Sequence, residues 1–333
     1  MHVHRFIAPL IVLTFLPGIS SLISQTRLEG FEPTQHWAEQ TKTIAFTPEV
    51  RIVINAPSAE KLTTNNPTTL IFYALPNGNT IEQTAGRKLS EGMDWHFNIQ
   101  HIAAQTRRLR EILPGKNIIV VYLEAQGKSW PQWRKKFPNS SEMIQRIVDT
   151  VKNEFRLFIP KIVLTGHSGG GSFIFGYLNG VRTIPGEVER IAFLDSNYGY
   201  DDSSGHGDKL IEWLKRDRDN HLNVIAYDDR DIMLSGKRVV GPDGGTFRAT
   251  QRMFTRFQKE VEFSVRQDST IREYSALDRH IEFLVHINPD TLILHTILVE
   301  KNGFLHAMTS GTPQEKEAGV FFGPKVYEEW IEQ

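Results

Sequence analysis

A serine lies between glycines at the spacing of a nucleophilic turn. The segment Gly166–Gly170 reads G-H-S-G-G, so Ser168 is the centre of a G-x-S-x-G pattern. The apolar run Lys161–Thr165 precedes it and a helical pattern follows it. Small residues relieve crowding in so sharp a turn, which exposes the serine hydroxyl. The N–H of Gly169 and the start of the helix can then stabilise an oxyanion, so the pattern predicts attack by Ser168 on a carbonyl carbon.

Apolar runs and amphipathic segments alternate along most of the chain. Several runs are continuously apolar, which is typical of strands buried on both faces of a parallel sheet. Expected strands are Val50–Asn55, Thr69–Leu75, Asn117–Leu123, Lys161–Thr165, Arg190–Leu194, Leu222–Tyr227 and Thr291–Leu298. Expected helices are Ile99–Ile112, Ser141–Arg156, Gly170–Asn179, Asp208–Arg216 and Phe247–Val265. This alternation predicts an α/β fold, with any site at the carboxyl ends of the strands.

The serine turn, placed within this alternation, resembles the α/β-hydrolase superfamily. The resemblance implies an α/β-hydrolase fold, with a mostly parallel central sheet flanked by helices, and the order serine, acid, histidine along the chain. The histidine is implied in a loop after the last strand. Because Thr291–Leu298 is the last expected strand, His306 is the expected general base. His295 lies inside the strand pattern and is expected to be a core residue.

The acid has two candidates. Asp231 follows the penultimate expected strand and best matches the position that the resemblance implies. Asp195 ends the strand before it, where some members of the superfamily carry the acid, and is the alternative. Asp228 and Asp229 stand close enough to Asp231 to compete. A strand-end turn or an Asx cap would also explain aspartates at these positions.

The second oxyanion donor is implied in the loop after the strand Thr69–Leu75. Related proteins often have His-Gly there, whereas this chain has Pro76-Asn77-Gly78. Asn77 and Gly78 can still present backbone N–H groups beside Gly169. An Asn-Gly dipeptide is also common in ordinary turns, and one turn can serve both purposes.

Composition excludes several classes of site. The 333 residues include no cysteine, which rules out a thiol nucleophile and thiolate metal sites. The 38 basic and 39 acidic side chains leave a net charge of -1, so no nucleic-acid partner is expected. No H-E-x-x-H pattern occurs and no Lys-Ser or Lys-Thr follows the glycine-rich turn, so neither a metal, a phosphate loop nor any cofactor is expected.

The beginning of the chain predicts export. Residues 1–24 combine a short basic start, the apolar run Phe6–Leu16 and small residues, as in a secretory signal peptide. The run is too short to span a bilayer, and no second long apolar segment follows, so stable membrane insertion is not expected. Residues 25–333 are expected to form one α/β-hydrolase domain, with a possible lid or cap insertion at about 235–290.

These residues together predict a secreted or periplasmic serine hydrolase that acts through an acyl-enzyme. Ester hydrolysis is the first hypothesis because it is the superfamily's most frequent reaction, which is an analogy of fold. An amidase or peptidase with the same triad is the alternative, acting on small-molecule or polymer substrates. A non-catalytic secreted binding protein on the same scaffold is the hypothesis from another class.

Overall fold

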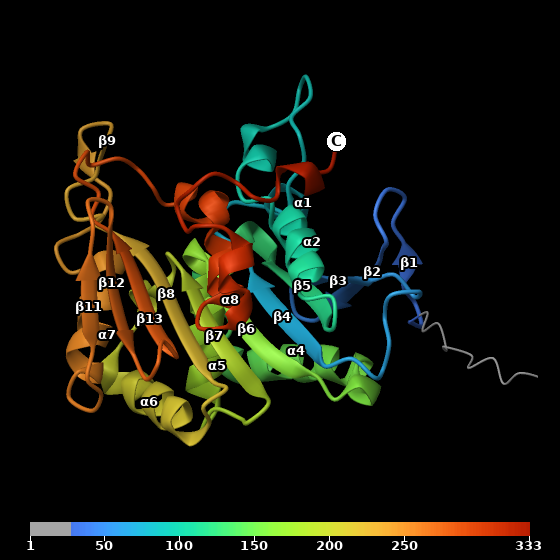
Figure 1. The fold of residues 1–333 in the computed structure, drawn as a ribbon, viewed down its shortest axis with the longest axis horizontal. Coiled ribbons are helices and arrows are strands. Elements are labelled where there is room, and N and C mark those ends of the chain that lie inside the picture. Colours follow the sequence, from blue (N-terminus) through green and yellow to red (C-terminus); the bar gives the residue numbers. More distant parts are fainter. Residues whose placement is uncertain (1–27) are drawn as a thin grey trace, which may run out of the picture.

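A mixed eleven-stranded sheet forms the centre of the molecule (Figure 1). The computed structural model describes residues 28–333, and the predicted signal peptide lies outside them. The strand order is β1-β2-β3-β5-β4-β6-β7-β8-β13-β12-β11. Strands β5, β4, β6, β7, β8 and β13 are parallel neighbours, and antiparallel strands extend the sheet at both edges. This arrangement confirms the predicted α/β fold class.

The elements have the following bounds. The strands of the sheet are β1 (Glu32–Pro33), β2 (Glu39–Phe46), β3 (Val50–Pro57), β4 (Thr68–Ala74), β5 (Asn117–Ala125), β6 (Lys161–His167), β7 (Val188–Leu194), β8 (His221–Tyr227), β11 (Ser264–Gln267), β12 (Ile271–Ala276) and β13 (Ile281–His286). A separate hairpin pairs β9 (Met233–Leu234) with β10 (Lys237–Arg238). The α-helices are α1 (Ile81–Ala85), α2 (Ile102–Ile112), α3 (Trp130–Lys136), α4 (Ser140–Glu154), α5 (Gly171–Gly180), α6 (His206–Arg216), α7 (Thr246–Phe257) and α8 (Phe304–Thr309).

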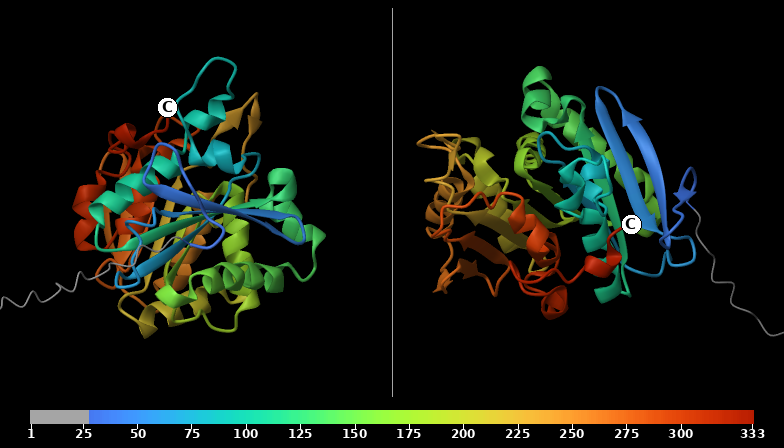
Figure 2. Two further views of the ribbon diagram at one scale, coloured as in Figure 1. Left: turned by 90° about the vertical axis from the view of Figure 1, so that its right-hand side faces the viewer. Right: turned by 90° about the horizontal axis from the view of Figure 1, so that it is seen from above.

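Helices bury both faces of the sheet, which explains why its strands are apolar throughout. Along β4, Leu70 and Phe72 join one hydrophobic cluster, whereas Ile71 and Tyr73 join the other, because successive side chains of a strand point to opposite faces. The first cluster is completed by α3, α4, α5, α6 and α7, and the second by α1, α2 and α8. Figure 2 shows the sheet between these two helical layers.

The end of the chain differs from the prediction in a way that affects the site. Thr291–Leu298 is not a strand: a loop over residues 291–294 leads into a turn at His295, and Ile297 and Leu298 are helical. The last strand of the sheet is β13, Ile281–His286, which lies parallel to β8. The region 235–290, considered as a lid or cap insertion, instead contributes α7 and the strands β11, β12 and β13 to the central layers.

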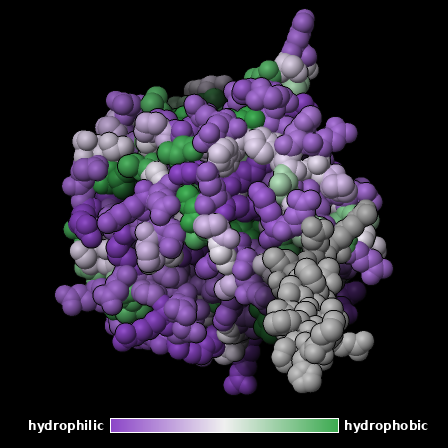
Figure 3. Space-filling model, turned by 45° about the vertical axis from the view of Figure 1, so that its right-hand side comes forward, coloured by the Kyte–Doolittle hydropathy of each residue, from purple (hydrophilic) through white to green (hydrophobic). Residues whose placement is uncertain are grey.

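No helix among residues 28–333 is long and apolar enough to cross a membrane. On the face drawn in Figure 3, hydrophilic residues cover most of the surface and hydrophobic residues form small patches between them.

Two glycines let α5 approach the sheet closely. A Cβ atom on Gly170 would lie 2.1 Å from the carbonyl oxygen of Ala74, and one on Gly171 would lie 1.7 Å from the carbonyl oxygen of Ser196. Both obstacles are backbone atoms, which cannot rotate away as a side chain can. The sequence of the serine turn therefore serves packing as well as chemistry.

We expect Gly171→Ala to lower the free energy of unfolding by about 2–3 kcal/mol, because the new methyl group forces α5 away from β7. Urea unfolding monitored by circular dichroism measures this change. Gly186→Ala is the matched control, since nothing lies within 4 Å of a Cβ atom there. Equal urea midpoints for the two variants would contradict the packing argument.

Candidate active site

Ser168 sits at a strained turn directly after β6. Its φ angle is 54°, a left-handed conformation that costs energy for a residue with a side chain. A 3₁₀-helical turn, Ser168–Gly170, leads from the strand into α5. The hydroxyl of Tyr198 donates a hydrogen bond to Oγ of Ser168 over 3.2 Å. The predicted strand-turn-helix context of the serine is confirmed, and the turn holds its side chain partly exposed.

A histidine and a buried aspartate form a hydrogen bond near this turn. Asp195 follows β7 and is 1% exposed, and its Oδ2 lies 2.5 Å from Nδ1 of His295. The hydroxyl of Thr246 donates to the other carboxylate oxygen. Because Nδ1 faces a carboxylate, neutral His295 carries its proton there and leaves the lone pair on Nε2. Nε2 has no hydrogen-bond partner among residues 28–333, so it can accept a proton.

His167 connects this histidine to the serine. Its ring nitrogen Nε2 donates to the backbone carbonyl of His295 over 2.9 Å, and the two ring centroids are 4.5 Å apart. Burial, with a smaller contribution from His295, lowers the pKa of His167 well below its usual range, so this ring stays neutral. The bond ties the His295 loop to the residue immediately before Ser168. Ser168, His295 and Asp195 are thereby brought to the same end of the sheet.

The structure places His306 away from the serine turn. This residue lies on α8, where its Nε2 is 2.7 Å from Oε2 of Glu282 on β13. The register across β8 and β7 places Glu282 level with Thr165, three strands away on β6. That separation is roughly 15 Å, so Glu282 and its partner His306 do not reach Ser168.

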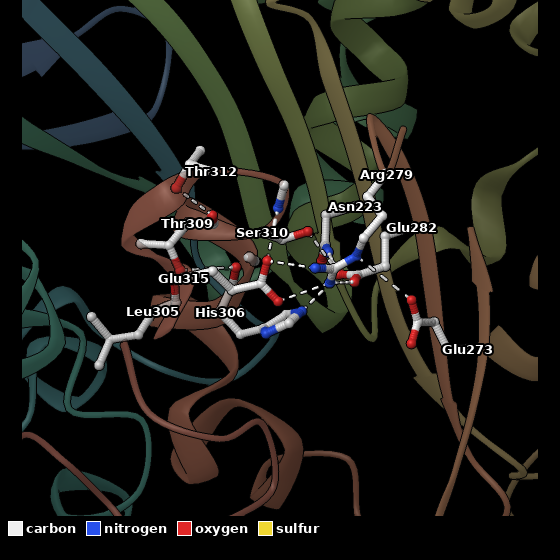
Figure 4. A network of polar contacts seen from close by, with 12 residues as sticks. Asn223, Glu273, Arg279, Glu282, Leu305, His306, Thr309, Ser310, Thr312 and Glu315 are labelled. Atoms are coloured by element: carbon white, nitrogen blue, oxygen red, sulfur yellow. Dashed lines mark hydrogen bonds and ion pairs between the residues drawn. The ribbon is translucent and has the colours of Figure 1, made fainter. Parts of the chain in front are cut away.

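The surroundings of His306 explain its buried position (Figure 4). Glu282 also accepts hydrogen bonds from Asn223, Ser310 and Arg279. Burial alone would raise the pKa of Glu282, but His306, Ser310 and Arg279 together lower it to about 2. The network fastens α8 and the loop after it to β8 and β13, which is a structural role.

The same network contains groups of the types that bind metals. Side-chain atoms of Glu282, His306 and Glu315 lie within 4.8 Å of one another. The guanidinium of Arg279 already donates to both oxygens of Glu315 over 2.8 Å and also bonds Glu282. A cation of the protein therefore occupies the position in which a metal ion would balance these carboxylates.

Of the two candidate acids, the structure brings the alternative to a histidine. Asp231 is 68% exposed and forms an ion pair with Arg238 over 3.3 Å, in the turn before β9. It makes no contact with a histidine in the described part of the chain. The guanidinium of Arg230 donates hydrogen bonds to both carboxylate oxygens of Asp228. Asp195 is the carboxylate that bonds His295, so the geometry favours the alternative, Asp195, over Asp231.

The loop expected to supply the second oxyanion donor does lie beside the serine turn. A Cβ atom on Gly169 would lie 2.0 Å from Oδ1 of Asn77, so the Asn77 side chain covers Gly169 directly. The N–H of Gly78 is already used, because it donates to the carbonyl of Lys128 over 2.9 Å. Asn77 makes no hydrogen bond to another of residues 28–333. Gly169 and Asn77 are therefore the available donors, and Gly78 is not.

His295 could not be recognised as a site residue from the sequence, because its neighbours have the composition of a strand. The run Thr291–Leu298 is apolar and partly β-branched, which favours a strand by composition. The run Ile281–His286, with Asn288-Pro289-Asp290 as a turn signal after it, was the better candidate. With that strand as the last one, the rule that places the base in the following loop selects His295.

The sheet is mostly parallel, and it carries a serine turn after β6, a buried aspartate after β7 and a histidine after its last parallel strand. This is the arrangement that the resemblance to the α/β-hydrolase superfamily implies.

Comparison with known proteins gives distant structural matches. No protein-family model and no curated protein sequence matches the chain. Similar solved structures include a thermostable esterase, with 10% identity over 82% of this chain and 63% of that chain and a TM-score of 0.47. The chain thus spans less than two thirds of that esterase. Others are a feruloyl esterase module from Clostridium thermocellum (11% identity, 77% and 86% covered, TM-score 0.45) and a glucuronoyl esterase from Solibacter usitatus (11%, 78% and 80%, 0.41).

Variants of the two histidines should separate their roles. We expect His306→Ala to lower the free energy of unfolding by about 3 kcal/mol, because Glu282 keeps its buried charge but loses a partner. The remaining folded protein should still react with a fluorophosphonate at Ser168. His295→Ala should also lower the free energy of unfolding, because buried Asp195 loses one of its two donors, but its folded fraction should fail to react. Urea unfolding measures the stability of each variant, and mass spectrometry measures labelling at Ser168. A folded His306→Ala variant that fails to label would contradict the structural role of His306.

The network also predicts a pH dependence of stability. The pKa of Glu282 is near 2 in the folded protein and 4.5 when unperturbed, so its ionised form stabilises the fold above pH 4.5. This contribution should disappear as the pH falls from 4.5 towards 2. We expect the unfolding free energy of Glu282→Gln to fall less over that interval than that of the natural protein, as measured by urea unfolding at each pH. If the unfolding free energies of the two proteins fall in parallel between pH 4.5 and 2, Glu282 does not contribute to the pH dependence of stability.

Proposed function

We propose that the protein is a serine hydrolase that cleaves carboxylic esters through an acyl-enzyme on Ser168. The observation that carries the proposal is the hydrogen bond between Asp195 and His295, held beside the strained serine turn by His167. A nucleophile, a base with a free Nε2 and an acid that orients the base are the three groups that this chemistry requires. The triad proposed here is Ser168, His295 and Asp195.

The first half of the reaction forms the acyl-enzyme. Nε2 of His295 takes the proton of Ser168 Oγ as the oxygen bonds the carbonyl carbon of the ester. The carbonyl oxygen becomes an oxyanion, which the N–H of Gly169 and an N–H of Asn77 stabilise. The bond to the leaving alcohol then breaks, and the alcohol oxygen takes the proton from Nε2. Asp195 stabilises the imidazolium between these two proton transfers.

The second half regenerates the serine. Water gives a proton to Nε2 of His295 while its oxygen bonds the acyl carbon. The second tetrahedral intermediate collapses, the bond from the carbon to Ser168 Oγ breaks, and Oγ takes the proton back. The net change is one water consumed and one acid and one alcohol released. No hydrogen bond joins Ser168 to His295 in the structure, and such contacts commonly tighten only when substrate binds.

Esters are the first choice of substrate for a chemical reason. An alcohol leaves more readily than an amine, so a triad able to acylate on an amide also acylates on the corresponding ester. The ester assay therefore tests the whole class, and amide or peptide hydrolysis by the same residues is the second candidate. Export to a secreted or periplasmic location stays a prediction, because residues 1–24 lie outside the described part of the chain.

The direct test is covalent labelling of the serine. The natural protein should form one adduct with a fluorophosphonate, at the peptide that contains Ser168, and should hydrolyse p-nitrophenyl acetate. Ser168→Ala should lose both, and His295→Ala and Asp195→Asn should lower kcat by about 10⁴-fold or more, because the base or its orientation is lost. Asp231→Asn is the matched control and should keep full activity. A folded natural protein without adduct or turnover would favour the non-catalytic binding protein instead.

A further inference from the structure

A second buried carboxylate lies behind the proposed triad. Asp229 follows β8, just as Asp195 follows the neighbouring strand β7, and it is 3% exposed. Its Oδ2 accepts the backbone N–H of Thr246 over 2.8 Å, and the hydroxyl of the same threonine is 3.4 Å away. That hydroxyl donates to Oδ1 of Asp195. Thr246 therefore bridges the two carboxylates. The mechanism proposed above gives Asp229 no role.

The local backbone is adapted to this carboxylate. Gly245 has a φ angle of 89°, and a Cβ atom there would lie 2.5 Å from both oxygens of Asp229. Thr246 begins α7, so the carboxylate faces the N-terminus of a helix, where the helix dipole favours negative charge. The other oxygen, Oδ1, is buried without a hydrogen-bond partner in the structure. The surrounding backbone thus fixes the position of the Asp229 carboxylate but leaves one of its two oxygens without a hydrogen bond.

The charge of Asp229 changes close to neutral pH. Burial and the neighbouring Asp195 raise its pKa to about 6, against the opposing effect of the N–H groups at the start of α7. Burial raises the pKa values of both neighbouring tyrosines, so they stay uncharged there. The charged and titratable groups that face Asp229 are Asp195 from β7, Tyr198 from the loop after it, Tyr227 from β8 and Arg230 from the following turn.

We propose that Asp229 is a positioning residue of the active site: through Thr246 it fixes Asp195, and in its ionised form it adds a second negative charge behind His295. This inference rests on the proposed function of Ser168. The imidazolium formed in each proton transfer is then stabilised by two carboxylates, because Asp195 contacts it and Asp229 lies on the far side of Asp195. Below about pH 6 the second charge is lost, and with it this stabilisation of the imidazolium.

The pH dependence of kcat/KM tests this inference. We expect Asp229→Asn to move the acid limb of the profile to lower pH by about one unit, which is the order of magnitude for removing one nearby charge. The plateau should fall about tenfold, because the imidazolium that forms when Ser168 gives up its proton is less stabilised. The amide keeps the size of the side chain and its acceptor for the N–H of Thr246. A purely structural role would lower the plateau and leave the limb in place.

Two further variants make the result specific. Asp231→Asn removes the same charge from an exposed position in the same turn and should leave the profile unchanged. Thr246→Val removes the bridging hydroxyl and should lower kcat with little change in KM, whereas Thr246→Ser should restore kcat. If Asp229→Asn does not fold, this pair still tests the bridge.

The outcomes distinguish this inference from the function on which it rests. If the natural protein labels at Ser168 and turns over the ester, but the acid limb of Asp229→Asn coincides with that of the natural protein, the role of Asp229 is overturned alone. The positioning role of Asp229 is also overturned if Asp231→Asn shifts the acid limb as far as Asp229→Asn does, or if Thr246→Val keeps the full kcat of the natural protein. If the natural protein neither labels nor turns over, the proposed function and this inference fail together.

Discussion

The hydrogen bond between Asp195 and His295 is the contact on which the site depends. A carboxylate that is 1% exposed is costly to bury unless donors satisfy it, and this one has two, the imidazole Nδ1 and the hydroxyl of Thr246. Both donors come from segments far along the chain, so the loop after β13 and the start of α7 must return to the end of β7. The parallel sheet makes this possible, because neighbouring parallel strands end at the same edge.

Two pairs of a histidine and a buried carboxylate occur among residues 28–333, and their surroundings separate their roles. The Glu282–His306 pair is sealed between α8 and the sheet, where Ser310 and Arg279 satisfy the carboxylate. The other pair leaves a ring nitrogen of His295 free at the edge where the strained serine lies. A proton can be exchanged with substrate only at such an exposed position, so accessibility and not pairing distinguishes a base from a structural histidine.

The sequence predicted those features that local patterns determine. The serine turn could be recognised because glycines, a buried strand and a helix occur together, and six of the seven expected strands exist. The histidine beside Asp195 could not be identified from the sequence, because choosing between His295 and His306 required knowing which apolar run joins the sheet. Ile281–His286 pairs with β8, whereas Thr291–Leu298 is loop, turn and the start of a helix. The acid stayed open because aspartates follow two adjacent strands, and only the tertiary structure shows which one meets a histidine.

A crystal structure of the protein after reaction with a fluorophosphonate tests the central claim most directly, because the phosphonate imitates the tetrahedral intermediate. The account predicts a covalent bond from phosphorus to Ser168 Oγ, with Nε2 of His295 at hydrogen-bond distance, about 3 Å, from the adduct or from Oγ. A phosphonyl oxygen should accept the N–H of Gly169. An adduct on another residue, or a labelled Ser168 whose nearest imidazole is not His295, would contradict the account.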